Sequence, residues 1–199
     1  MDGVGALVAG ALRLDPAAFT AIASDPAGVR IAALVLIGSG LSHVLGQSVA
    51  LVANRVPPWR FVLSIALGAA IFAASVGVWA GALGVAGAVA FDRPTPFAQV
   101  VAIVGLAHAP RLFGFVALTP YFGAGIGAAL TVWTFLALAV GARATFGFSL
   151  TEALFALGAA WLVTELLART VGRPVVAATR RIRERVAGRP GADGTERRR

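Results

Sequence analysis

The chain has no cysteine and no lysine, and only one methionine and one tyrosine, among its 199 residues. Without cysteine, neither a disulfide framework nor a thiolate ligand or nucleophile is available. Charged residues make up only 13% of the chain, whereas 58% are hydrophobic, more than a soluble domain of this size needs to fill one core. We therefore predict an all-α, polytopic transmembrane helical bundle.

All 17 basic residues are arginine, which we interpret as the coding bias of a GC-rich, bacterial genome. A net charge of +8 would point to nucleic acid in a soluble protein, but ten of the arginines lie from Arg169 onward. Basic charge at one end of a membrane protein is first a topology signal. We expect no nucleic-acid partner, and a location in the bacterial plasma (inner) membrane.

Five apolar stretches are long enough to cross the hydrocarbon core, which is about 30 Å thick. The predicted spans are residues 30–52, 61–83, 97–119, 121–141 and 150–168. Together they form a transmembrane domain over residues 30–168. An interfacial segment, 1–29, precedes it, and a basic cytoplasmic tail, 169–199, follows it, first amphipathic and then disordered.

Several short motifs predict where helices begin. Asp15-Pro16 and Asp25-Pro26 each pair a capping side chain with a proline at the first helical position. Thr95-Pro96 and Thr119-Pro120 open the third and fourth spans by the same logic. Residues 149–152, Ser-Leu-Thr-Glu, match a capping box at the start of the fifth span, so Glu152 is interpreted as a helix cap.

The third span has a polar centre, His108, Pro110 and Arg111. Proline lacks an N–H, so the Leu106 carbonyl loses its helical donor and the span should kink or break. A central arginine costs roughly 2.5 to 3.5 kcal/mol in a membrane and therefore needs a partner or trapped water.

Neutral groups must solvate Arg111, because no Asp or Glu lies in the central part of any predicted span. We expect its guanidinium to donate to Gln47 or Ser39 of the first span. His108 and the Leu106 carbonyl are further candidate acceptors.

The first span carries a polar stripe at i, i+4 and i+8, which faces the third span in our prediction. The candidate intramembrane polar cluster is Ser39, His43, Gln47, His108 and Arg111. It either lines a solute or proton path or holds an anionic group, or it only fixes the packing of the two spans. Two histidines without a carboxylate or thiolate are an incomplete ligand set, so no metal, cofactor or catalytic residue is expected.

Small residues recur every four positions in four spans, and we expect them to let the helices approach closely. The predicted stripes are Gly38, Ser42, Gly46 and Ala50; Ala69, Ala73, Gly77 and Gly81; Gly123, Gly127 and Thr131; and Ala156, Ala160, Thr164 and Ala168.

The tail combines an apolar stripe with a basic face. Arg180, Arg181, Arg183 and Arg185 surround the apolar stripe, the pattern of an amphipathic helix on a membrane surface. We expect these arginines to bind anionic lipid headgroups.

Arginine counts predict the topology. With five spans, four arginines lie on the side of the N-terminus and 12 on the other side, so the C-terminus should be cytoplasmic and the N-terminus outside. If the third span is instead re-entrant, four spans place both ends in the cytoplasm.

Features in the third to fifth spans resemble the YIP domain family of membrane proteins, which is named for interaction with Ypt/Rab GTPases. The resemblance spans residues 30–168 and rests on His108-Ala109-Pro110, Pro120-Tyr121-Phe122-Gly123, Trp133, Arg143 and the segment from Ser149 to Leu154. It implies five spans and a membrane role without catalysis.

We therefore predict a non-enzymatic integral membrane protein with a scaffolding, assembly or membrane-organising role and a protein partner. The alternative is a small transporter or channel-like protein that uses the polar groups of the first and third spans. A transporter needs a water-accessible cavity that reaches His43 or Arg111.

Overall fold

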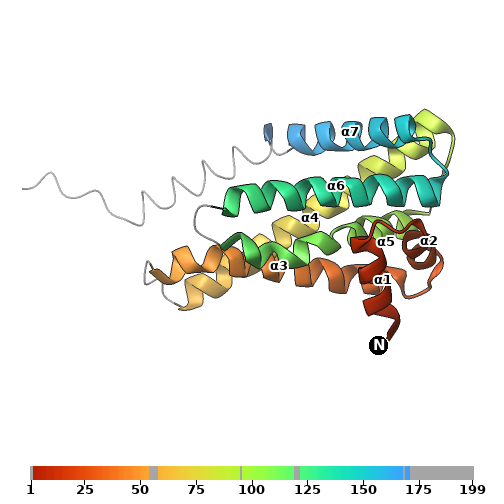
Figure 1. Cartoon of the computed structure of the whole chain (residues 1–199). Coiled ribbons are helices and arrows are strands. Elements are labelled where there is room, and N and C mark those ends of the chain that lie inside the picture. Colours follow the sequence, from red (N-terminus) through yellow and green to blue (C-terminus); the bar gives the residue numbers. More distant parts are fainter. Residues whose placement is uncertain (1, 54–57, 95, 119–121, 168, 171–199) are drawn as a thin grey trace, which may run out of the picture. The chain divides into compact units, whose positions relative to one another are not determined.

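The computed structural model describes the backbone of residues 2–53, 58–94, 96–118, 122–167 and 169–170. Side chains are described over the same ranges except at residues 2, 43–74, 118 and 167. The elements in these ranges are all helices, which confirms the prediction of an all-α fold. Their bounds are α1 Asp2–Leu12, α2 Pro16–Ser24, α3 Gly28–Ala53, α4 Pro58–Phe91, α5 Phe97–Ala107, the 3₁₀ helix η1 Ala109–Leu118, α6 Gly123–Phe146 and α7 Leu150–Leu167 (Figure 1).

Two helical stretches are long and apolar enough to cross a membrane, Phe97–Ala117 and Gly123–Phe146. This statement covers the residues with described side chains, so residues 43–53 of α3 and 58–74 of α4 fall outside it. The chain divides into two compact units, residues 1–161 and 162–199. Segment 1–29, predicted as a separate interfacial part, therefore belongs to the first compact unit.

The predicted helix starts are correct at α2 and α7, where a side chain forms the N-cap. Asp15 is the N-cap of α2, and its side chain accepts from the Ala17 N–H at 2.9 Å. Asp25 also accepts from the Ala27 N–H, at 2.7 Å, but it is the C-cap of α2, and α3 begins at Gly28, two residues after the predicted first helical residue Pro26. The capping box at α7 is complete, because Glu152 accepts from the Ser149 N–H at 2.7 Å and donates its own N–H to the Ser149 hydroxyl at 3.3 Å.

The starts assigned to Thr-Pro pairs are less accurate. Pro96 has an extended ψ of 130°, so it is the N-cap of α5 rather than its first helical residue. Thr95, Thr119 and Pro120 lie outside the described residues. Helix α6 begins at Gly123 and continues to Phe146, five residues beyond the predicted end of the fourth span.

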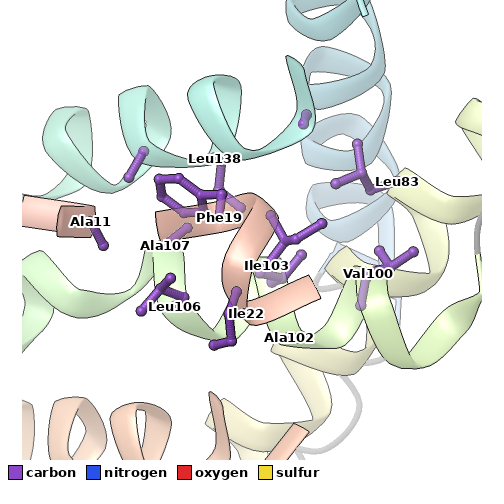
Figure 2. Close-up of a cluster of buried hydrophobic side chains, with 14 of the residues drawn as sticks. Ala11, Phe19, Ile22, Leu83, Val100, Ala102, Ile103, Leu106, Ala107 and Leu138 are labelled. Atoms are coloured by element: carbon purple, nitrogen blue, oxygen red, sulfur yellow. The ribbon is translucent and has the colours of Figure 1, made fainter. Parts of the chain in front are cut away.

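The core of the first unit brings α2, α5 and α6 together. Phe19 and Ile22 of α2 are fully buried in one cluster with Ile103 and Leu138 (Figure 2). A Cβ on Gly141 would lie 2.5 Å from Ile103 Cγ2 and 2.8 Å from Phe19 Cδ1. Gly141 therefore makes the space into which Phe19 inserts, and α2 is a core element rather than a purely peripheral helix.

The predicted small-residue stripes make close contacts at described residues of α3 and α7 and at Gly123 of α6, but not at the other described residues of the α4 and α6 stripes. Gly38 lies against the Leu112 side chain, and Ala156 and Ala160 are fully buried. In contrast, a Cβ on Gly77, Gly81 or Gly127 would meet nothing within 4 Å, and Thr131 is exposed. Periodicity alone cannot tell which face of an Ala/Gly-rich helix meets a neighbour. The side chains of Gly46, Ala50, Ala69, Ala73 and Ala168 lie outside the described residues.

Candidate functional site

The predicted break at Pro110 takes the form of a change in helix type. Helix α5 ends at Ala107, and the N–H of His108 points to the carbonyls of Gly105 and Leu106. From Ala109 the chain continues as the 3₁₀ helix η1, in which the Arg111 N–H donates to the His108 carbonyl at 2.9 Å. Runs of 3₁₀ helix longer than three or four residues are uncommon, so ten residues of it need support from outside the segment.

Ser39 of α3 supplies part of that support. Its hydroxyl lies 3.0 Å from the His108 carbonyl oxygen and 2.7 Å from the Val35 carbonyl oxygen in its own helix. The single hydroxyl proton is therefore shared between α3 and the point where α5 ends. Ser39 is only 1% exposed, so this bond forms without competition from water.

Ser42, one turn further along α3, serves two groups of η1. Its hydroxyl donates to the Leu112 carbonyl at 2.8 Å and accepts from the Phe115 N–H at 2.9 Å. A buried backbone group without a partner costs about 1–3 kcal/mol. Ser39 and Ser42, three residues apart on one face of α3, thus stabilise the altered backbone of η1.

His108 is buried and binds to its own preceding turn. Its Nδ1 lies 2.7 Å from the Val104 carbonyl oxygen, which can only accept, so Nδ1 carries the proton. Ser39 contacts the carbonyl of His108 and not the imidazole. The two residues are close, but their arrangement is not that of a nucleophile with its base.

Arg111 makes no hydrogen bond to Ser39, one of the two first-span acceptors that we expected. The Ser39 hydroxyl is bonded to two carbonyls, and the N–H of His108 is directed at Leu106. Nε of Arg111 is buried and has no hydrogen-bond partner among the described residues. The side chains of His43 and Gln47 lie outside the described residues, so the predicted bond from Arg111 to Gln47 stays a prediction.

A second polar cluster, which sequence reasoning missed, joins three helix ends. Arg93, between α4 and α5, donates to the carbonyls of Phe146, at 3.3 Å, and Gly147 at the C-terminus of α6. The same nitrogen lies 3.6 Å from the Glu152 carboxylate, and the guanidinium is 5.6 Å from the centre of the Phe148 ring. A cation at a helix C-terminus is favourable, but no local pattern signals a partner more than fifty residues away.

Trp133, in the middle of α6, makes a further contact that the sequence does not reveal. Its indole Nε1 donates to the carbonyl of Leu12, the last residue of α1, at 3.2 Å. This bond satisfies a carbonyl that has no partner within its own helix.

The four candidate lipid-binding arginines, Arg180, Arg181, Arg183 and Arg185, lie outside the described residues, and their role stays a prediction. Within the described part of the chain, no three His, Cys, Asp or Glu side chains are grouped so that they could hold a metal ion. No family model, curated protein or solved structure matches this chain.

Proposed function

We propose that the protein is an integral membrane protein of the YIP-like kind, with a scaffolding, assembly or membrane-organising role and no reaction of its own. Its five spans are α3, α4, the combined α5–η1 segment, α6 and α7. The role implies a protein partner, which the resemblance does not identify.

The observation that carries this proposal is the distribution of apolar and polar side chains. Leu34, Ile37 and Leu41 of α3 are all more than half exposed, whereas Ser39 and Ser42 of the same helix are buried. Other exposed large apolar residues of the first unit include Val85, Val89, Phe113, Phe115, Val116, Val132, Leu136, Leu154, Phe155 and Trp161. Soluble monomers rarely expose so much contiguous apolar surface, but helices in lipid do.

Contacts at both ends of α6 favour a complete membrane crossing by α5–η1 rather than a re-entrant segment. Arg93, just before α5, bonds to Gly147 at the C-terminal end of α6. At the other end, a Cβ on Gly123 would lie 2.3 Å from the carbonyl oxygen of Ala117 in η1. The two segments therefore run antiparallel along the same length (Figure 1).

The length of α5–η1 is sufficient for that crossing. Eleven residues of α-helix and ten of 3₁₀ helix rise about 37 Å in total, more than the hydrocarbon core of about 30 Å. The serine bonds to η1 supply the backbone partners that a 3₁₀ segment needs away from water.

Site-directed labelling tests the proposed topology. The chain has no cysteine, so single cysteines at positions 20 and 190 can be labelled with an impermeant reagent from outside intact cells. Five spans with a cytoplasmic C-terminus predict reaction at position 20 only. Reaction at neither position would support four spans with a re-entrant third span. Reaction at position 190 alone would show that the orientation is the reverse of the proposed one.

A partner assay tests the scaffolding role. The full-length protein, extracted in a gentle detergent, should retain one resident membrane partner at constant stoichiometry. Arg111→Leu should weaken both the fold and that retention if the polar cluster is structural. Consistent recovery of a single monodisperse species without any partner would argue against the scaffold.

One observation favours the alternative, a small transporter or channel-like protein. The buried Nε of Arg111 is a costly group to keep without a described partner, and such residues in spans are commonly functional. An Arg111→Leu variant that is fully folded but has lost solute flux in proteoliposomes would support transport. Full retention of flux would exclude Arg111 from a transport path.

A further inference from the structure

Helices α1 and α2 form a tight pair whose turn is built from Arg13, Leu14 and Asp15. Leu14 has a left-handed φ of 58°, and the Asp15 N–H donates to the Gly10 carbonyl at 2.9 Å, which closes the end of α1. A Cβ on Gly10 would lie 2.6 Å from the Cβ of Ala18, so the two helices touch directly. The backbone of the turn is therefore held in a single conformation.

The turn lies opposite the middle of α6. The Leu12 carbonyl, at the end of α1, accepts from the Trp133 indole, and α1 also packs against α5 and η1. Trp133 is ten residues from the exposed Arg143, which corresponds to about 15 Å along a helix. Side chains lean toward the N-terminus of their helix, so the indole does not shorten this distance.

From this turn α2 runs back toward the Arg143 end of α6. Phe19 packs at Gly141, two turns closer to that end than Trp133. Helix α2 thus packs against α5 and α6, while α1 contacts α5 and η1 and runs across the long helices (Figure 1). If α6 crosses the membrane as proposed above, the turn reaches about half the depth of the hydrocarbon core of about 30 Å.

The turn presents two exposed charged side chains, Arg13 and Asp15, whereas the hydroxyls of Thr20 and Ser24 donate to carbonyls of their own helix. Arg13, Asp15, Thr20 and Ser24 are all exposed. On α6, at the level of the turn, the exposed side chains are uncharged: Thr131, with Val132 and Leu136 at 59% and 47%. Charged side chains near the bilayer centre are tolerated where water enters or the bilayer thins locally.

We propose that the turn at Arg13–Asp15 draws water and lipid headgroups about halfway into the bilayer beside Trp133. Asp15 already accepts from the Ala17 N–H, whereas the guanidinium of Arg13 presents a planar donor set to a headgroup phosphate. The membrane is therefore thinned on one side of the bundle. This inference rests on the proposed crossing by α6, and it gives the membrane-organising role a physical basis.

Thiol reactivity in lipid nanodiscs, which expose both membrane faces, tests the proposal. Single-cysteine variants Arg13→Cys and Thr20→Cys are compared with Val132→Cys, and Arg143→Cys is the reference in water. Each variant is reconstituted in phosphatidylcholine with phosphatidylglycerol, its helix content is checked by circular dichroism, and it is treated with a charged methanethiosulfonate.

Position 13 should react within about tenfold of position 143, because both thiols can ionise in water. Position 132 should react at least about 100-fold more slowly, because a charged reagent and a thiolate are excluded from hydrocarbon. Reaction as slow as at 132 at both 13 and 20 would overturn the hydrated turn and leave the crossing intact, because Thr20→Cys retains the Arg13 guanidinium that Arg13→Cys removes. Reaction at 132 as fast as at 143 would instead overturn the crossing by α6. If Arg13→Cys does not fold, the reaction rate of Thr20→Cys relative to positions 132 and 143 decides between these outcomes.

Discussion

Gly105 of α5 and Ala32 of α3 lie so close that a Cβ on Gly105 would be 2.4 Å from the Cβ of Ala32 and 3.0 Å from its Cα. The contact involves backbone, which cannot rotate away as a long side chain could. Helices α3 and α5 therefore pack closely here, one turn before α5 gives way to η1. Small residues at such contacts are a main source of packing energy between helices in lipid.

Gly105→Ala should separate α3 from α5 and destabilise the protein by about 1–3 kcal/mol. Gly127→Ala is the matched control, because a Cβ there meets nothing within 4 Å and alanine favours the helix by up to about 1 kcal/mol. Unfolding by sodium dodecyl sulfate in mixed micelles, monitored by circular dichroism, measures the stability of both variants. Equal stability of the two variants would contradict the close contact.

Ser42→Ala should destabilise the protein by about 1–3 kcal/mol, because it removes two hydrogen bonds to η1, each contributing about 0.5–1.5 kcal/mol. Thr131→Ala is the control, since that exposed hydroxyl donates only to Gly127 in its own helix. Hydrogen exchange of the Phe115 amide gives an independent measurement. Unchanged protection of this amide in Ser42→Ala would show that the hydroxyl does not hold η1.

Arg93→Met should cost more than Glu152→Gln, because Arg93 donates to two carbonyls at the end of α6 as well as pairing with Glu152. A double-mutant cycle should assign only about 0–1 kcal/mol to the ion pair, since both side chains are partly exposed. Raising the salt concentration should therefore affect the wild type little. A coupling well above this range would place the stabilisation in the ion pair rather than in the helix cap.

Trp133→Phe should loosen the α1–α2 pair, because it removes the donor to the Leu12 carbonyl while retaining most of the aromatic area. We expect a loss of about 0.5–1.5 kcal/mol in global stability and faster hydrogen exchange across residues 3–24. Trp161→Phe, at an exposed position, is the control. Exchange that is unchanged over α1 and α2 would contradict a stabilising role for the indole.

Local signals determined much of the helical framework before any tertiary contact was known. Asp15 and the Ser149–Glu152 capping box act within one helical turn, so their roles follow from the sequence alone. The missing N–H of Pro110 likewise predicts a break at that position, because the effect arises in the proline itself.

The partners of the polar groups were decided by the tertiary structure. Ser39 is bonded to a His108 carbonyl rather than to Arg111, because the change to 3₁₀ helix turns backbone oxygens toward α3. Arg93 meets Gly147 and Glu152, and Trp133 meets Leu12, across long stretches of chain. In an Ala/Gly-rich helix every face looks alike in the sequence, so only packing selects Gly105 and Gly141 as contacts and leaves Gly127 open. Composition and short-range capping set the helices, and their packing determined which polar and small residues meet.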